Sequence, residues 1–339
     1  MTQMGSLSKD MVAAEQEKQQ EFALRSQLQQ QAHLTDVAFP LLRSGVPLCG
    51  KMVARRAGLS FANAWDYKKD WQPAARRIGL GDTVSVLHVA AGSGAERAGL
   101  KAGDRILAVD DEEVVFGQGG TEAVSKRLGK LEASDAPSVR ITYLRDSTKA
   151  TVEVPLDSAC AFDVAAETDQ VLNAWADGRN VVVTSAMMRF VGSDDELATV
   201  VAHEIAHNAM GHINAKKKNA LFGALLGAVA DVALAGGGYN SGGAFTREGA
   251  EAGAMVFSQD FEREADYVGL YIMALGGRPI TEAPKLWRRM AAELPGNIKF
   301  ASSHPTTAER FVRLEQWIAE IQGKEARGEP LRPEMKPQR

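Results

Sequence analysis

His203-Glu204-Ile205-Ala206-His207 lies in a stretch whose pattern predicts a helix over 193–210. Ser193, followed three residues later by Glu196, forms a capping box, and apolar residues then recur at helical spacing. Residues four apart lie on one face of a helix, so both imidazoles can bind one metal ion. Glu204 is rotated around the axis, and we expect its carboxylate to deprotonate a metal-bound water as a general base. This spacing is typical of zinc hydrolases.

A catalytic zinc site usually has three protein ligands and one open position, so a third ligand is expected elsewhere in the chain. The candidate stretch is a second predicted helix over 261–276, which ends near Gly276-Gly277. We predict Glu264 as the ligand. Asp266, two residues further on, points to a different face and is predicted to support the site. Composition alone leaves the alternative of a solvated charged face, because this stretch carries four charged residues, namely Glu262, Arg263, Glu264 and Asp266.

Linked motifs in the order of a known family extend over residues 173–310. They are Asn173-Ala174 with Asp177-Gly178-Arg179, the strand Val181–Ser185, the zinc motif, Glu264-Ala265-Asp266, and His304-Pro305 with Arg310. They resemble metallopeptidase family 48, the gluzincin endopeptidases related to the CaaX prenyl protease and to mitochondrial and bacterial envelope quality-control proteases. The resemblance implies one Zn²⁺ per chain, bound by His203, His207 and Glu264, with Glu204 as the base.

His304 and Arg310 are further catalytic candidates, because the oxyanion of a tetrahedral intermediate needs a cation or a hydrogen-bond donor beside it. Either side chain could supply that contact. In relatives the loop equivalent to His304 can also approach the zinc, so this histidine could gate the site instead. His304-Pro305 could also simply begin the last helix. His212, five residues after His207, is predicted to be a structural histidine.

The strand predicted over 181–185 has two interpretations. Zinc peptidases hold an extended substrate by adding it to a sheet edge, and this strand could be that edge. It could equally be an interior strand, and the sequence does not choose between them.

An upstream segment over 76–156 contains the run Gly92-Ser93-Gly94-Ala95-Glu96-Arg97-Ala98-Gly99-Leu100, which resembles a PDZ domain of the bacterial protease-associated type. Alternating apolar residues predict flanking strands over 83–89, 139–144 and 150–154, with a helix over 121–131. Such a groove adds a peptide as a strand and captures its terminal carboxylate with backbone amides. Gly79-Leu80-Gly81 is the candidate carboxylate loop, although Asp82 beside it would repel a carboxylate. The unit could instead be a spacer that orients the protease.

The composition is that of an ordinary globular protein, with 45% hydrophobic and 24% charged residues and a formal net charge of −4. This charge and the absence of a basic, aromatic-rich patch argue against nucleic-acid binding. Cys49 and Cys160 flank the PDZ-like unit and are either disulfide-bonded, which would indicate an oxidising compartment, or two buried thiols. No secretory leader is recognisable, so we expect a cytosolic protein or one whose leader was trimmed.

The apolar segment 219–238 is shorter than a membrane span, and Asp231 interrupts it. Three interpretations remain open: an interfacial helix whose Lys216–Lys218 meet lipid headgroups, a lid over the cleft, and a buried helix in an oligomer.

We therefore predict an α+β protein with a mostly helical gluzincin domain, a small antiparallel sheet and an inserted PDZ-like domain. The predicted segments are a helical or flexible tether (1–32), a helical part of the peptidase (33–75), the PDZ-like domain (76–156), the zinc peptidase domain (157–322) and a disordered tail (323–339). The predicted function is zinc-dependent cleavage of polypeptides, including misfolded envelope proteins, in a periplasmic or membrane-associated setting. The competing hypothesis is a chaperone-like binding protein whose metal site is structural or inactive.

Overall fold

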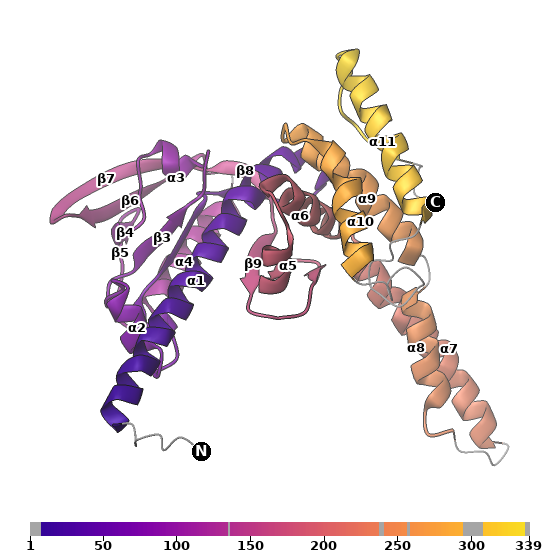
Figure 1. The fold of residues 1–339 in the computed structure, drawn as a ribbon, viewed down its shortest axis with the longest axis horizontal. Coiled ribbons are helices and arrows are strands. Elements are labelled where there is room, and N and C mark those ends of the chain that lie inside the picture. Colours follow the sequence, from indigo (N-terminus) through magenta and orange to yellow (C-terminus); the bar gives the residue numbers. More distant parts are fainter. Residues whose placement is uncertain (1–7, 135, 237–240, 256–257, 294–307, 336–339) are drawn as a thin grey trace, which may run out of the picture. The chain divides into compact units, whose positions relative to one another are not determined.

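The computed structural model describes residues 8–134, 136–236, 241–255, 258–293 and 308–335. The chain divides into two compact units (Figure 1). Unit 1 comprises Met1–Arg43 and Val53–Ala161, and unit 2 comprises Ser44–Met52 and Phe162–Arg339. Both units contain helices and strands, which confirms the predicted α+β class.

Unit 1 is built on a six-stranded sheet in the order β2-β3-β4-β6-β7, with β5 paired to β4. These strands are β2 (Leu59–Ala62), β3 (Ser85–Val89), β4 (Arg105–Val109), β5 (Glu112–Glu113), β6 (Ser138–Arg145) and β7 (Thr148–Pro155). A separate antiparallel pair joins β1 (Val53–Arg56) to β8 (Asp157–Cys160). Because β2 belongs to the large sheet, this sheet begins before residue 76, where we predicted the PDZ-like domain to start.

Helices complete unit 1 and close its core. They are α1 (Lys9–Ser44, whose last residue belongs to unit 2), α2 (Gln72–Arg77), α3 (Gly94–Arg97) and α4 (Gly120–Glu132), with a 3-10 turn η2 (Ala64–Asp66). Val124 and Leu128 of α4 pack among the buried sheet residues. Gly94 must be glycine, because a Cβ there would lie 1.7 Å from the carbonyl oxygen of Pro155.

Helix α1 contains most of the segment that we predicted as a helical or flexible tether over 1–32, and it is packed on unit 1. It is continuous from Lys9 to Ser44, and Leu24 is buried against the segment around α2. Glu17 forms an ion pair with Arg77 at 2.7 Å, and Asp36 lies 2.8 Å from His88 of β3. Residues 33–43 and 53–75, which we predicted to belong to the peptidase domain, therefore fall within unit 1.

The two cysteines of the chain, Cys49 and Cys160, are disulfide-bonded. Of the two alternatives left by the sequence, the disulfide is the one present. The disulfide closes a loop of about 110 residues. In the chain-entropy account, this adds about 4 to 5 kcal/mol to the free energy of unfolding.

Unit 2 combines a three-stranded sheet with helices. The strands β9 (Asp163–Glu167), β10 (Ala174–Ala176) and β11 (Asn180–Thr184) lie in the order β10-β11-β9, with β11 parallel to β9 and antiparallel to β10. The helices are α5 (Ser185–Phe190), α6 (Asp194–Ala209), α7 (His212–Gly236), α8 (Ala244–Met255), α9 (Ser258–Leu275), α10 (Ala283–Glu293) and α11 (Ala308–Ala326), with 3-10 turns η1 (Val46–Leu48) and η3 (Ile280–Glu282). Among the described helices, none has the length and apolarity needed to cross a membrane.

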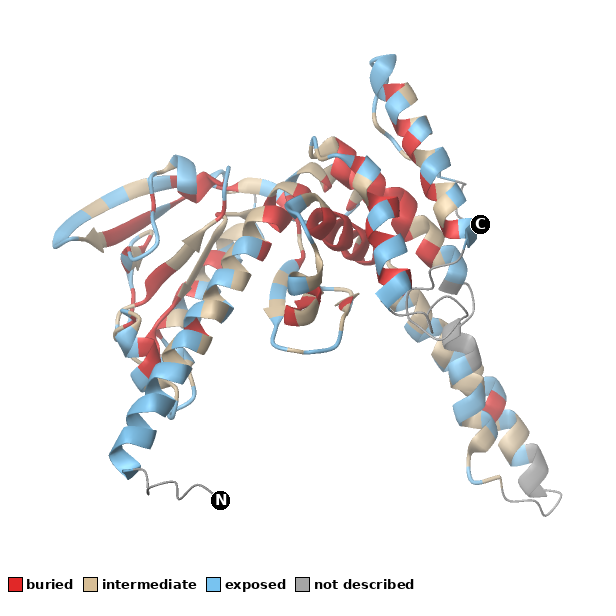
Figure 2. Ribbon diagram, in the orientation of Figure 1, coloured by how far each residue is buried: buried red, intermediate tan, exposed pale blue. Residues whose placement is uncertain are grey.

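Helix α6 is the centre of unit 2. Every residue from Glu196 to Asn208 is buried, as the continuous red of this helix in Figure 2 shows. One half of the predicted capping box is formed, because Ser193 Oγ accepts from the amide of Glu196. The Glu196 carboxylate accepts from the amide of Gly192 at 2.6 Å, one residue before the cap. A helix buried on all sides holds its side chains in fixed positions, which suits a site that needs several aligned donors.

Residues 323–335 are more ordered than we predicted for the tail over 323–339, whose last four residues lie outside the described residues. Helix α11 continues to Ala326, and Lys324 donates to the carbonyl oxygen of Arg332 at 2.9 Å. The amide of Glu334 donates to the hydroxyl of Tyr267 on α9 at 2.9 Å. Residues 327–335 are thus bonded to the helical part of unit 2.

Candidate metal centre

Helix α9 lies close against α6 beside His203, where Gly269 makes the contact possible. A Cβ on Gly269 would lie 3.2 Å from the backbone nitrogen of His203 and 3.3 Å from its Cα. Glu262 and Asp266 precede Gly269 by seven and three residues, so all three lie on one face of α9. This face presents two carboxylates to the histidines of α6.

His203, His207 and Glu262 form a compact buried cluster of donor atoms. The two Nε2 atoms lie 3.1 Å apart. The carboxylate oxygens of Glu262 lie 3.4 Å from Nε2 of His203 and 3.4 Å from Nε2 of His207. Among the described residues, these three form a group whose ligand atoms all lie within 4.8 Å of one another. Two imidazole nitrogens and one carboxylate oxygen match the donor set of catalytic zinc sites, which keep a fourth position open.

Glu262 therefore takes the position that we predicted for Glu264. Glu264 is directed to another partner, because its Oε2 lies 2.8 Å from Nε2 of His212, and its side chain is 32% exposed against 7% for Glu262. A signal in the sequence could have found the difference. Glu262 and Asp266 are four residues apart and share a helix face, as His203 and His207 do, whereas Glu264 and Asp266 cannot both face α6.

A buried carboxylate and a guanidinium support His203. Oδ1 of Asp266 lies 3.0 Å from Nδ1 of His203, which leaves Nε2 directed to the donor cluster. Arg310 donates to both carboxylate oxygens of Asp266, through Nε and Nη2, each at 2.7 Å. Its guanidinium also lies over the ring of Trp287, 3.9 Å from the centroid. The supporting role predicted for Asp266 thus fits its contacts.

These contacts give Arg310 a role other than the predicted stabilisation of an oxyanion. Its Nε and Nη2 both bind Asp266, and the side chain is 5% exposed. Arg310 therefore positions a carboxylate that positions a candidate ligand. His304, the other predicted catalytic residue of this region, lies outside the described residues.

His212 and Glu264 support His207 in the same manner. Nδ1 of His212 lies 3.0 Å from Nδ1 of His207, and the imidazole of His212 stacks on the ring of Phe261 with centroids 4.6 Å apart. His212 is 1% exposed, in keeping with the structural role predicted for it. The chain of contacts from Glu264 through His212 to His207 fixes the second imidazole from behind.

The charges around the cluster favour a cation between the donors. Burial disfavours a charged His203, but hydrogen bonds and charges from Asp266 and Glu262 outweigh it and raise the pKa of His203 to about 9. Burial lowers the pKa of His207 to about 4. Burial also opposes ionisation of Asp266, yet the Arg310 charge and His203 lower the pKa of this carboxyl. Metal binding in such a site displaces a proton, so it competes with protonation of the imidazoles.

Glu204, the predicted general base, follows His203 in α6 and is 3% exposed.

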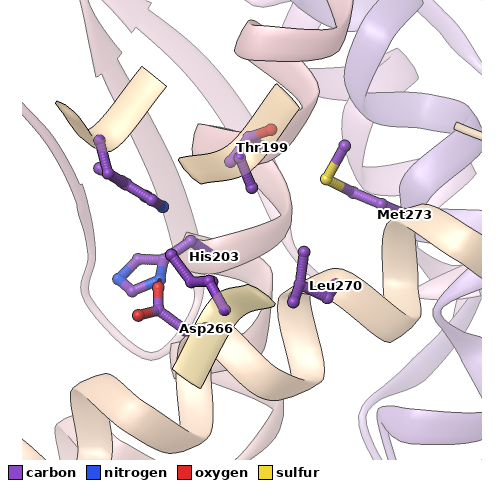
Figure 3. Close-up of a pocket in the computed structure, with 9 residues that line it drawn as sticks. Thr199, His203, Asp266, Leu270 and Met273 are labelled. Carbon is purple, nitrogen blue, oxygen red and sulfur yellow. Dashed lines mark ion pairs between the residues drawn. The ribbon is translucent and has the colours of Figure 1, made fainter. Parts of the chain in front are cut away.

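A small pocket next to His203 and Asp266 is lined by Thr199, Leu270 and Met273, among others (Figure 3). Neither His207 nor Glu262 lines this pocket. The pocket is therefore a small cavity beside His203 and not the candidate metal site.

Strand β11 is interior, which decides between the two interpretations of residues 181–185. It pairs with β10 on one side and β9 on the other, so it offers no free edge to a substrate. The turn before it is tied to the metal helix instead. Asn208 of α6 accepts from the amide of Gly178 at 2.7 Å and donates to the carbonyl oxygen of Asn180 at 3.0 Å. The motif at residues 177–179 thus fixes the end of α6.

Asp266→Asn is expected to weaken zinc binding by about 10- to 100-fold, the usual effect of removing a residue that orients a ligand. It should also lower the thermal midpoint, because buried Arg310 loses its ionic partner. Competition titration with a zinc chelator measures the first effect. Asp260→Asn on the same helix is the control, because Asp260 has a side chain that is 59% exposed. Equal zinc affinity in both variants would contradict the supporting role of Asp266.

Comparison with known proteins places these features in context. The sequence profile of Peptidase family M48 matches residues 140–318, and that of the PDZ domain matches residues 58–156. The chain is 30% identical over 151 residues to the mitochondrial metalloendopeptidase OMA1 of Schizosaccharomyces pombe, covering 43% of each chain. It is 32% identical over 130 residues to the beta-barrel assembly-enhancing protease of Yersinia pestis, covering 36% of this chain and 26% of that protein. The chain thus spans less than half the length of these relatives. The crystallised HtrA3 PDZ domain shares 15% identity, with a TM-score of 0.24, and matches 32% of this chain and 88% of its own.

Proposed function

Because the chain belongs to peptidase family M48, we propose that it is a zinc-dependent endopeptidase that cleaves polypeptide substrates. The observation that carries the proposal is the buried cluster of His203, His207 and Glu262, whose donor atoms face one another from α6 and α9. Relatives with metalloendopeptidase and protease in their names support it.

In the proposed reaction, His203, His207 and Glu262 hold Zn²⁺. When bound, the ion supplies Lewis acidity toward the scissile carbonyl and lowers the pKa of a water molecule. Glu204 accepts a proton from the attacking water and donates it to the leaving amine. Asp266 and His212 keep the two imidazoles in the rotation that directs Nε2 to the metal, so the site is organised before substrate arrives.

The PDZ-like domain is proposed to bind an extended peptide at β2, which is an edge strand of the described sheet. Edge strands accept a further strand through main-chain hydrogen bonds. The amide of Ala57, just before β2, donates to the carboxylate of Glu132 at 3.4 Å, so a carboxylate already lies at the start of this edge. The predicted loop Gly79-Leu80-Gly81 follows α2, and the carbonyl oxygen of Gly81 accepts from the amide of Ala64, two residues after the end of β2, at 2.9 Å. Leu80 is buried in the cluster that contains Leu24.

We also propose an oxidising compartment of the bacterial envelope, with misfolded envelope proteins as substrates. The disulfide between Cys49 and Cys160 supports this location, since such bonds persist in oxidising surroundings. The relatives named beta-barrel assembly-enhancing protease support it as well.

Removing the metal tests the activity directly. The purified chain is expected to contain one zinc per molecule and to cleave casein, a loosely folded protein. Treatment with 1,10-phenanthroline should abolish cleavage, and added Zn²⁺ should restore it, because the ligands and base remain in place. Metal content measured beside casein cleavage checks this. Unchanged cleavage by protein shown to be metal-free would rule out the proposed reaction.

A further inference from the structure

The outer face of α7 is an exposed apolar stripe. Its members are 57% to 73% exposed and recur at helical spacing: Leu221, Phe222, Leu225, Leu226, Val229 and Val232. From the first to the last, the stripe runs about 17 Å along the helix. Contiguous apolar surface of this kind marks a site of interaction with a protein or a membrane. Figure 2 shows the exposed residues along α7 and α8.

Two lysines continue the stripe toward the start of the helix. Lys217 and Lys218 are exposed and precede Leu221 and Phe222 by four residues, so they lie on the same face. Lys216, by contrast, is turned toward the metal centre, 3.8 Å from Glu262. The face therefore presents cationic groups at one end and hydrocarbon along the rest.

The opposite side of α7 packs on α8 with backbone against backbone. A Cβ on Gly227 would lie 1.9 Å from the carbonyl oxygen of Phe245, and one on Gly249 would lie 2.2 Å from that of Gly223. Close crossing through glycines four residues apart is a packing that helices use in lipid, where large apolar side chains point outward. In this hairpin the large side chains of α7 likewise point away from α8.

The acidic residues of the hairpin are kept off the stripe. Asp231 is the only acidic residue of α7, and its carboxylate accepts from the amide and hydroxyl of Thr246 at 2.9 and 2.6 Å. Glu248 and Glu251 are exposed, but they belong to α8. The hairpin is thus amphipathic as a unit, apolar and cationic along α7 and charged along α8.

We propose that the hairpin of α7 and α8 binds an anionic membrane surface, with the stripe of α7 in the interface and Lys217 and Lys218 on lipid phosphates. Apolar contact together with lysine attraction is the chemistry of interfacial helices. Self-association through α7 would bring the same lysines to a face that carries no exposed carboxylate, whereas anionic headgroups neutralise them. The binding does not depend on peptidase activity.

Flotation of the full chain with lipid vesicles tests the proposal. The protein should float with vesicles of equal parts phosphatidylglycerol and phosphatidylcholine, and less with phosphatidylcholine alone or at high salt. The double variant Phe222→Ser/Leu225→Ser should bind at least about tenfold more weakly. Lys217→Gln/Lys218→Gln should lose on the order of tenfold on anionic vesicles only. All four residues are exposed, so circular dichroism and the thermal midpoint should stay unchanged.

Phe116→Ser is the matched control, because Phe116 in unit 1 and Phe222 are both 63% exposed. It should leave flotation unchanged. The proposal is overturned if the natural chain does not float, or if Phe116→Ser loses as much binding as the α7 variant. It is also overturned if the α7 variant changes only the sedimentation coefficient, since that result identifies a second copy of the chain as the occupant.

Discussion

Glu204→Gln is expected to lower peptide hydrolysis by about 100- to 10,000-fold, the range that a positioned general base contributes. The amide has the shape of the carboxylate but cannot accept the proton of the attacking water. Zinc content and thermal midpoint should stay near those of the natural chain, because the metal donors are His203, His207 and Glu262. Initial rates of casein cleavage, with zinc content of the same samples, measure the effect.

Asp194→Asn is a suitable control for this substitution, since Asp194 is the exposed first residue of the same helix. It should cleave casein at the natural rate. The experiment also separates the enzyme from the chaperone-like alternative, in which the metal is structural. Full turnover by Glu204→Gln would exclude Glu204 as the base and leave the binding protein as the better account.

Glu262→Ala is expected to remove stoichiometric zinc and with it all measurable cleavage. The substitution leaves only two imidazoles, and the loss of affinity should exceed the roughly 10- to 100-fold that a supporting residue costs. Glu264→Ala, two residues away on α9, is the matched comparison. It removes only the contact behind His212, so this variant should still hold one zinc per chain. Metal analysis after dialysis against a weak chelator distinguishes the two.

The opposite ranking would restore the assignment that the sequence alone suggested. If Glu264→Ala lost zinc while Glu262→Ala kept it, the position of Glu262 between the imidazoles would not describe the metal-bound protein.

The zinc helix could be predicted almost completely from sequence, because its signals are local. One segment holds the Ser193 cap, the apolar spacing and the two histidines, and each of these depends only on helix geometry. The strands over 83–89, 139–144 and 150–154 were predictable for the same reason, since their apolar residues alternate.

The third donor was harder, because it depends on which face of α9 meets α6. Gly269, seven residues after Glu262, allows that contact. A single glycine in a helical sequence does not predict that another helix packs closely against it. Arg310 illustrates the same limit. An arginine near a predicted catalytic site suggests a cation that stabilises an oxyanion. The ion pair of Arg310 with Asp266 depends on how α11 packs against α9, which the sequence does not show.

Long-range pairing explains the remaining differences. Residues 9–32 are rich in polar side chains and indicated a solvated helix or a tether, yet Leu24 is buried against residues 64–80. The tail after residue 323 is rich in charge, yet it is bonded to Tyr267 through the amide of Glu334. Both segments gain their order from distant parts of the chain, which composition does not record.

The most direct test of the metal centre is anomalous diffraction at the zinc edge from crystals of the zinc-loaded protein. We expect one peak per chain, about 2.0 to 2.2 Å from Nε2 of His203, Nε2 of His207 and a carboxylate oxygen of Glu262, the usual zinc distances. A peak bound by Glu264, or one that His203 and His207 do not share, would contradict the account.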